Sequence, residues 1–280
     1  MNWPLWVGLP LLVLLYYASR KRTQPQSVQQ VPSAVATSAL KAKQTYDAFL
    51  VVDVEATCEE GKNFAYPNEI IEFPVYLMKW KDRIGGQASQ LEIAAEFQTF
   101  VQPTWRPKLS KFCTDLTSIT QEQVDAAPRF PEVLRSLRAF LVEHGVLEKT
   151  GKRRLKFCWA TDGPWDVAEF VVKQAFISQI PVPDWLAGEA LDVRQLVRNH
   201  LASNSKTVRG NLNISAQLGA LGLPPFVGRE HRGSDDAQNI CRILQKLATE
   251  QVPIRPNLHI NLRRRWAWMG KSGQILEDKI

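Results

Sequence analysis

Cysteine is scarce in this chain, and the few cysteines present are not grouped. Cys58, Cys113, Cys158 and Cys241 are the four cysteines among 280 residues, and no Cys-x-x-Cys pair occurs. Zinc ribbons and disulfide frameworks place cysteines at short, regular spacings, so both classes are disfavoured. We expect no disulfide partner for these thiols, as is usual in a reducing compartment.

Internal repeats are also lacking, which disfavours solenoid and propeller folds. The length of 280 residues suits one domain of catalytic size with appended segments. The apolar fraction of 45% is ordinary for a globular protein. The formal net charge of +7 permits an acidic partner, either nucleic acid or an anionic membrane surface, but it proves neither.

Charge is missing from the N-terminal stretch at 3–18, and basic residues are missing ahead of it. Arg20, Lys21 and Arg22 follow directly. The apolar stretch is close to the lower length limit of a membrane span, and the basic residues behind it place the rest of the chain on the cytosolic side. We expect an uncleaved anchor at 1–22, in the endoplasmic reticulum or the mitochondrial outer membrane.

Two alternatives to an anchor remain open for this N-terminal stretch. One is a cleaved targeting peptide, although the basic region that usually starts such a peptide is absent and the cleavage site is poor. The other is a soluble, buried helix. Residues 23–44 then change to Gln, Ser, Val, Pro and Ala, which indicates a flexible linker. We expect the folded domain at 45–252 and a basic, tryptophan-containing tail at 253–280.

Within the domain, local patterns predict a sheet with helices packed on it. Apolar and β-branched runs predict strands at 48–54, 69–80, 96–101 and 155–160, the first three as an antiparallel meander. Pro74 lies inside the second run and indicates an edge position or a bulge. Helical spacing predicts helices at 131–144, 166–179, 192–200, 214–221 and 234–250, and Thr120 to Gln123 suggests a further helix start. Ser234 is the expected N-cap of the last helix. The order indicates an α/β layer fold with a mixed sheet.

Two carboxylates end the first predicted strand. Asp53 and Glu55 are two residues apart, so they share one face of the strand where its apolar run stops. Taken alone, the pair is equally compatible with a solvated strand end. A similar pattern follows the strand at 155–160, where Asp162 and Asp166 flank a Gly-Pro turn.

A third group of polar residues lies before the last helix. His231 is in a glycine-bounded loop, and Asp235 and Asp236 follow in the first helical turn, where the helix dipole also favours acids. Converging carboxylates hold Mg²⁺ or Mn²⁺, and two such ions about 3.5–4 Å apart catalyse phosphodiester hydrolysis. A neutral histidine nearby can accept a proton from the attacking water. This inventory of residues fits two-metal phosphoryl chemistry.

Three segments, in this order, resemble the DEDDh 3′-to-5′ exonuclease superfamily, which includes RNase T and DNA polymerase proofreading domains. They are "DVEATCEEG" followed by "NEIIEFPV", then "TDGPWDVAEF", and last "GREHRGSDDAQNICRIL". The Glu-Ala-Thr-Cys and Ile-Ile-Glu-Phe-Pro elements are more similar to the histone-mRNA 3′ exonuclease, or enhanced-RNAi exonuclease, branch than to proofreading domains. The likeness covers about 48–247.

This resemblance implies an RNase H-like fold, with a mixed five-stranded sheet flanked by helices. The fifth strand would lie near 190–196 or be very short. The resemblance also implies that four acids bind two Mg²⁺ or Mn²⁺ ions: Asp53, Glu55, Asp166 and Asp236. His231 would be the general base, and Glu55 counts as catalytic as well as metal-binding.

The resemblance further suggests residues near the substrate. Thr57 is a candidate contact of the terminal nucleotide, with an ordinary strand-end threonine as the alternative. Asp162, where many members have asparagine, would lie beside the metal-binding acids. Trp165 is a candidate base-stacking residue, with a plain cleft wall as the alternative. Phe64 and Tyr66, in the loop after the first motif, could also stack on a base.

The implied activity is metal-dependent 3′-to-5′ exoribonuclease action on single-stranded RNA 3′ ends, releasing nucleoside 5′-monophosphates. The alternatives are a 3′-5′ exonuclease for single-stranded DNA and a non-catalytic, membrane-tethered RNA-binding adaptor. No SAP-like or zinc-finger module is recognisable, so stem-loop specificity is not expected. In the tail, Arg263, Arg264 and Arg265 adjoin Trp266 and Trp268, which suits nucleic acid, or else tryptophans packed on the domain beside a solvated basic edge.

Overall fold

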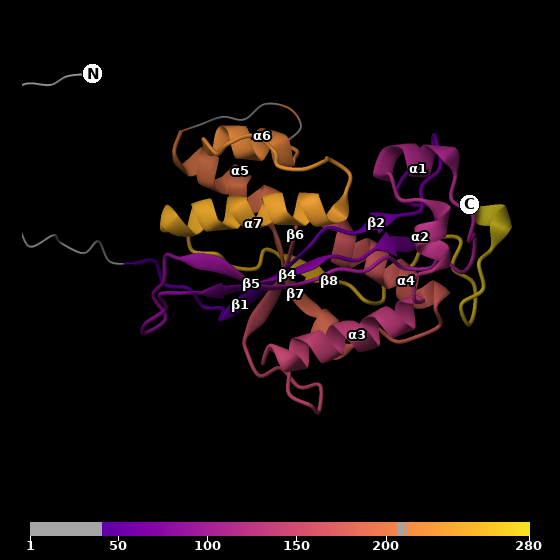
Figure 1. Ribbon diagram of the computed structural model, residues 1–280, viewed down its shortest axis with the longest axis horizontal. Helices are drawn as coiled ribbons and strands as arrows, with labels where there is room; N and C mark the ends of the chain where they lie inside the picture. The colour runs from indigo at the N-terminus through magenta and orange to yellow at the C-terminus, as the bar shows by residue number, and fades with distance from the viewer. Residues whose placement is uncertain (1–40, 206–209, 211) are drawn as a thin grey trace, which may run out of the picture. The chain divides into compact units, whose positions relative to one another are not determined.

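A mixed six-stranded sheet runs through the centre of the protein (Figure 1). The computed structural model describes residues 41–205, 210 and 212–280. The strand order is β5-β4-β1-β6-β7-β8, with parallel pairing of β6 to β1 and to β7 and antiparallel pairing elsewhere. The strands are β1 (Ala48–Val52), β4 (Val75–Trp80), β5 (Leu91–Phe97), β6 (Phe157–Thr161), β7 (Gly188–Asp192) and β8 (Leu258–Ile260).

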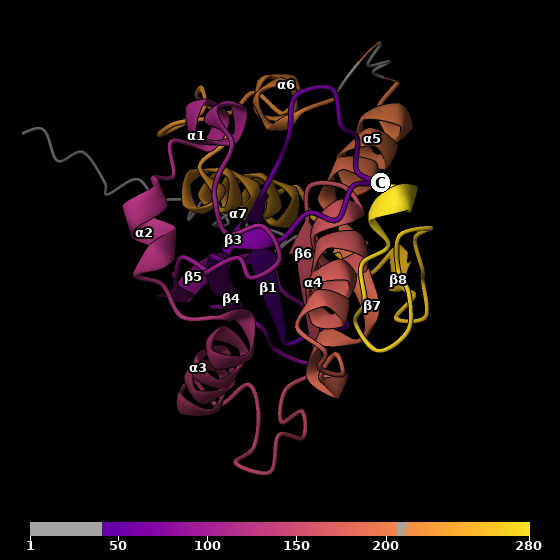
Figure 2. The same cartoon turned by 90° about the vertical axis from the view of Figure 1, so that its right-hand side faces the viewer.

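Helices cover both faces of this sheet. They are α1 (Lys111–Thr117), α2 (Gln121–Asp125), α3 (Phe130–Glu143), α4 (Val171–Ile177), α5 (Val193–Ser203), α6 (Ile214–Ala220) and α7 (Gly233–Thr249). Figure 2 shows α5, α6 and α7 on one side and α3 on the other. The central strand β1 is buried on both faces: Leu50 packs in the core shared with α3 and α4, and Val51 packs in the core shared with α5, α6 and α7. Two-sided burial explains the unbroken apolar run in β1.

The expected mixed α/β layer fold is confirmed, but the expected count of five strands is wrong. The predicted short strand near 190–196 exists as β7. The additional strand is β8, which comes from the segment expected to be a C-terminal tail and pairs Gly188 with Ile260. Without β8, the outer edge of β7 would present unpaired backbone N–H and C=O groups.

Two predicted strand ranges also need correction. The run at 69–80 is divided into β3 (Ile70–Glu72), which pairs with the short β2 (Glu55–Ala56), and β4. Pro74 lies at the break, where a residue without an N–H cannot continue the ladder. The third strand is 91–97 and not 96–101, because β5 is a largely exposed edge strand without a clear apolar signal.

The helix starts follow their capping groups. The capping box between Thr120 and Gln123 is present at α2. Ser234 is not the N-cap of α7: Arg232 holds that position, because Glu72 accepts the Gly233 N–H at 3.0 Å and Asp236 accepts the Arg232 N–H at 3.1 Å. Carboxylates thus satisfy the free N–H groups of this helix start.

The expected N-terminal anchor at 1–22, and most of the expected linker at 23–44, lie outside the described residues. Within the part of the chain that the structure describes, no helix has both the length and the hydrophobicity to cross a membrane. The four cysteines are free thiols.

Candidate active site

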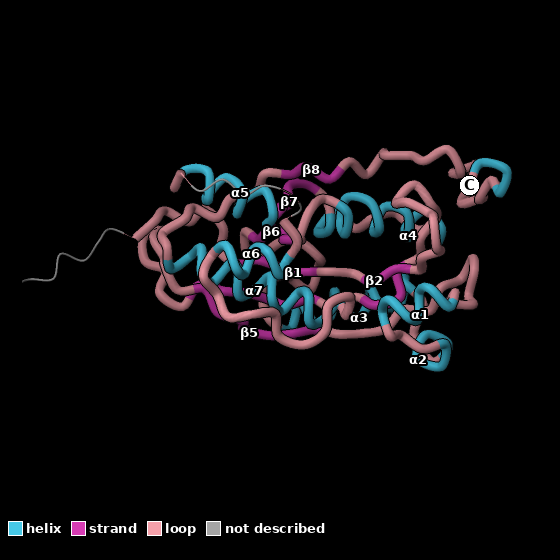
Figure 3. The backbone as a smooth tube through the Cα atoms, turned by 90° about the horizontal axis from the view of Figure 1, so that it is seen from above, coloured by secondary structure: helices cyan, strands magenta, loops and turns pink. Residues whose placement is uncertain are grey.

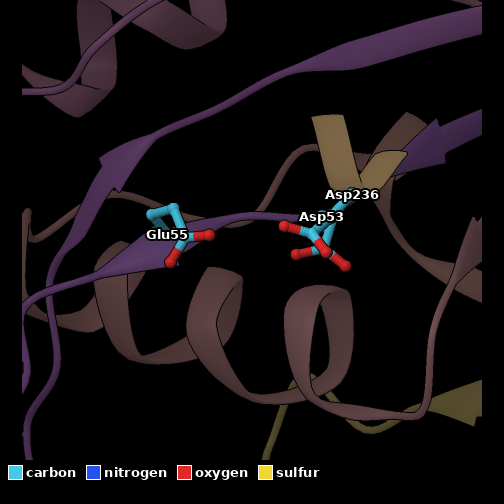
Figure 4. A group of neighbouring side chains, drawn as sticks. All are labelled: Asp53, Glu55 and Asp236. Carbon is cyan, nitrogen blue, oxygen red and sulfur yellow. The ribbon is translucent and has the colours of Figure 1, made fainter. Parts of the chain in front are cut away.

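Two carboxylates that are close in the sequence and a third from a distant part of it meet at the end of β1 (Figure 4). Asp53 directly follows β1, Glu55 begins β2, and Asp236 lies in the first turn of α7. Each of the three offers an oxygen, and these oxygens all lie within 4.8 Å of one another. They line a cleft of about 580 Å³. The pair that shares a strand face in the sequence therefore gains its third acid only through the packing of α7.

A close contact between α7 and β1 brings Asp236 to this point. A Cβ added at Gly233 would lie 2.5 Å from the backbone oxygen of Asp53, so no larger residue fits without moving the helix. The buried carboxylate of Glu72 accepts the Gly233 N–H at 3.0 Å and holds the same helix start from β3. The helix N-terminus also favours an acid at position 236.

Asp166 lines the same cleft, at the start of a π-helical turn, Asp166–Phe170, that leads into α4. Its Oδ1 accepts the backbone N–H of Val54 at 2.9 Å, directly between Asp53 and Glu55. The expected helix at 166–179 is therefore divided into a π turn and α4, and π turns are frequent at functional sites. The structure places all four expected metal-binding acids in one cleft, with Asp166 just outside the tightest group.

The electrostatics of the cleft disfavour four bare carboxylates. Burial raises the pKa of Asp53 well above its usual value, and the charges of Asp166 and Asp236 raise it further. Burial also raises the pKa of Glu55, with Asp236 adding to the effect. The pKa values of Asp166 and Asp236 rise to about 7, chiefly through burial. Hard oxygen donors this close together fit divalent cations such as Mg²⁺ or Mn²⁺, whose charge offsets both burial and repulsion.

His231 is exposed at the mouth of the same cleft. Its backbone is left-handed, with φ of 62°, in the turn just before α7. The next residue, Arg232, donates its N–H to Asp236, so the turn that carries the imidazole is held by one of the acids expected to bind metal. This placement suits a proton acceptor that contacts substrate only when the cleft is filled.

Asp162 lies in the cleft wall, but both of its oxygens have partners. Oδ2 pairs with Arg194 Nη2 at 2.6 Å, and Oδ1 accepts from Gln217 Nε2 at 2.7 Å. Asp162 therefore orients Arg194 and has no oxygen without a partner to offer to substrate. Arg194 was not among the site residues predicted from the sequence. Arg194 also lies over the Trp165 ring, 5.2 Å from its centroid. Arg194 lies two residues after β7, a strand parallel to β6. The carboxyl ends of parallel strands lie at one sheet edge, so this position in the sequence could have placed Arg194 near Asp162.

Of the aromatic residues expected to stack on a base, Trp165 and Phe64 line the cleft, whereas Tyr66 is outside its described lining. Trp165 lines the cleft, and Phe64 packs against it with ring centroids 5.5 Å apart. Thr57 is not among the described residues that line the cleft. Its hydroxyl accepts the Glu69 N–H at 2.9 Å and its own N–H donates to the Glu69 carbonyl at 2.7 Å, so it belongs to the contact between the two parts of the first motif.

Comparisons with known proteins agree with this geometry. A family model described as "Exonuclease" matches residues 50–244. The chain belongs to the exonuclease family. This exonuclease is 37% identical over 241 residues to "3'-5' exonuclease eri1" of Schizosaccharomyces pombe, an alignment that covers 81% of this chain and 74% of the relative. It is 35% identical over 216 residues to "3'-5' exoribonuclease 1" of Homo sapiens, covering 77% of this chain and 56% of the relative. The exonuclease thus spans little more than half the length of its human relative.

Solved structures give the same result for the fold. One is a 3'-exonuclease described in "3'-end specific recognition of histone mRNA stem-loop", with a TM-score of 0.68 and 31% identity over 80% of this chain and 71% of that chain. Another is the nuclease domain of 3'hExo, a DEDDh family member, bound to rAMP. It has a TM-score of 0.67 and 33% identity over 78% of this chain and all of that chain. The exonuclease is therefore of the DEDDh type, as its motifs predict.

The contact between Gly233 and Asp53 generates a testable prediction. Gly233→Ala should displace the start of α7, separate Asp236 from Asp53 and Glu55, and lower exonuclease turnover about a hundredfold, the usual effect of a shift near 1 Å at a reacting centre. Mn²⁺ titration should show weakened metal binding in the same variant. Gly219→Ala is the matched control, because its Cβ meets nothing within 4 Å on another helix. Unchanged Mn²⁺ binding in Gly233→Ala would contradict the prediction.

Proposed function

We propose that this protein is a metal-dependent 3′-to-5′ exoribonuclease that releases nucleoside 5′-monophosphates by two-metal-ion hydrolysis. The observation that carries the proposal is the meeting of oxygens from Asp53, Glu55 and Asp236 within 4.8 Å, with Asp166 lining the same cleft. Bound Mg²⁺ or Mn²⁺ ions would supply an acidified water and charge stabilisation for the leaving oxygen. The relatives named as exoribonucleases support RNA as the substrate.

Each part of the cleft has a distinct task in this proposal. The four acids would hold the cations, with Asp53 directly after β1 and Glu55 at the start of β2. A neutral His231 nitrogen accepts the proton of the attacking water at the cleft mouth. Trp165 and Phe64 form an apolar wall on which a terminal base can stack, while Arg194, oriented by Asp162, adds positive charge beside it.

Two alternative functions are compatible with a cleft lined by these four acids. A single-stranded DNA 3′-5′ exonuclease would need the same acids and cations, so the cleft alone does not separate it from an exoribonuclease. A non-catalytic RNA-binding adaptor is disfavoured, because four converging carboxylates without cations repel phosphate. Binding of RNA without any cation-dependent product would favour the adaptor.

The first prediction of this proposal concerns the reaction itself. The full-length protein should shorten 5′-labelled single-stranded RNA from its 3′ end with Mg²⁺ or Mn²⁺, and should stop when the metal is chelated. Asp53→Asn keeps the size of the side chain but removes a ligand charge, and it should lower turnover on the order of a thousandfold or more. A matched DNA oligonucleotide in parallel tests the substrate class. Normal turnover in Asp53→Asn would overturn the proposed function.

The second prediction concerns His231. His231→Ala should slow hydrolysis by about two to four orders of magnitude, the usual size of a general-base effect, with RNA binding largely retained. His259→Ala is the control, since His259 is also exposed but lies on β8, outside the cleft lining. An equal rate in His231→Ala and His259→Ala would remove His231 from its role.

We also propose that the charge-free stretch at 3–18 tethers the protein to a membrane of the endoplasmic reticulum or the mitochondrial outer membrane, with the exonuclease domain in the cytosol. Only the sequence supports this: the stretch is apolar and basic residues follow it. Leu12→Arg with Leu15→Arg should release the full chain from alkali-washed membranes, because each arginine costs about 3 kcal/mol in a span. A wild-type protein that washes off, or that lacks its first residues, would contradict the anchor, and the second result would favour a cleaved targeting peptide.

A further inference from the structure

The loop at 59–68 joins the two parts of the first motif and forms one rim of the cleft. Phe64 is the residue of this loop that contributes an aromatic ring to the cleft, and its side chain is half exposed. Its ring packs on Trp165 and Phe170, with centroid separations of 5.5 and 5.6 Å. Phe64 therefore supplies the loop-borne half of an aromatic wall, and the other half, Trp165, directly precedes the metal-binding Asp166.

Three successive carbonyl groups of this loop accept hydrogen bonds from side chains outside the loop. Lys173 of α4 donates its ammonium group to the carbonyl oxygens of Phe64 and Tyr66, and to Asn68 Oδ1 at 3.2 Å. Trp268 Nε1 donates to the carbonyl of Ala65 at 2.6 Å. The loop is thus held through its backbone, residue by residue, at the position that carries Phe64.

Lys173 occupies an unusual place for a lysine, since its side chain has no solvent exposure. Burial lowers the pKa of Lys173 to about 8, although Glu169, one turn earlier, opposes this effect. The aromatic rings of Phe170 and Trp266 lie 5.3 and 5.0 Å from its nitrogen. A buried lysine is expensive unless its donors are all used, and here they are directed at the loop.

The C-terminal segment, defined as residues 261–280, completes this arrangement. Figure 3 shows the chain running from β8 along α4 towards the C-terminus. Trp268 is buried, stacks on Trp266 with centroids 6.3 Å apart, and meets Phe176 of α4 edge-on at 5.7 Å. Arg264 pairs with Glu169 at 2.8 Å. The tryptophans of the expected tail therefore pack on the domain.

A second contact ties the end of this segment to the same loop. Glu277 accepts from Trp105 Nε1 at 3.1 Å and from Arg106 Nη2 at 2.7 Å. Arg106 Nη1 in turn donates to the hydroxyl of Tyr66 at 3.0 Å. The C-terminal segment consequently contacts the loop at Ala65 directly and at Tyr66 through Arg106.

We infer that the C-terminal segment, acting with Lys173, positions Phe64 as the wall that receives the terminal base of the substrate. This inference rests on the proposed function. The family match ends at residue 244, so the segment lies outside the matched region and adds to the substrate site from there. Trp268 and Lys173 are positioning residues, because they act through the loop and touch no reacting atom.

The physical consequence is a split between substrate affinity and turnover. The metal-binding acids stand on β1, β2, α7 and the π turn, and none of them depends on the loop carbonyls. A loop that is already ordered loses less conformational freedom when a base stacks on Phe64. Loss of the hydrogen bond from Trp268 should therefore raise KM and leave kcat nearly unchanged.

Trp268→Phe tests this inference in the full-length protein, because it removes the N–H donor and keeps an aromatic ring. We expect KM for single-stranded RNA to rise about fivefold, with kcat within twofold of wild type. Phe64→Ala should raise KM by at least as much, and adding Trp268→Phe to it should have no further effect. Trp80→Phe is the matched control, since it also removes an indole hydrogen bond to a carbonyl, of 2.9 Å to Tyr46, outside the cleft.

Amide hydrogen exchange of residues 59–68 without substrate gives a readout that does not depend on activity. Faster exchange of this loop in Trp268→Phe, and more so in Lys173→Met, supports the inference, whereas wild-type exchange in both variants overturns it. A fall in kcat with unchanged KM, or a KM effect of Trp268→Phe that persists beside Phe64→Ala, also overturns it. Absence of nuclease activity in the wild-type protein would refute the proposed function, while the exchange experiment would still decide whether the segment orders the loop.

Discussion

The arrangement of this protein depends on holding four carboxylates together where they repel one another. Burial and mutual charge raise the pKa of Asp53 and Glu55 well above their usual values, so the acids favour a divalent cation as a partner. The protein enforces this proximity with rigid contacts. Gly233 allows the start of α7 to touch the Asp53 backbone, and Glu72 binds the same helix start from β3. The fold thus holds mutually repelling carboxylates close together, at the place where bound cations would offset the repulsion.

The proposed substrate wall is held by other contacts than the proposed metal site. The acids lie just after the central strand β1, in the short strand β2 and at the starts of helical segments, whereas Phe64 belongs to a loop whose backbone is held by Lys173 and Trp268. Central elements suit groups that need sub-ångström placement, and a loop suits a surface that must admit different bases. Because different contacts hold the loop and the acids, a change in the loop can alter the affinity for substrate without changing the geometry of the acids.

The regular, buried parts of the fold could be predicted from the sequence, and the edge elements could not. The strand β1 is an unbroken apolar run and the helices α3 and α7 carry strong apolar periodicity, so their positions could be predicted to within a few residues. The exposed edge strand β5 and the three-residue β8 carry almost none, because side chains that face solvent or a neighbouring strand end follow no hydrophobic pattern. Pro74 was recognised as an irregularity, but not as the break between β3 and β4.

For the site, the sequence by itself determined which acids were available and that Asp53 and Glu55 lie together at a strand end. Alternation along a strand and periodicity along a helix are local properties, so they can be read from the chain. Only the tertiary structure decided that Asp236 joins the tight group and that Asp162 pairs with Arg194. It also decided that Thr57 lies outside the cleft lining and that the C-terminal segment contacts the loop that carries Phe64. Those contacts join residues far apart in the chain, and their distances depend on how whole helices and strands pack.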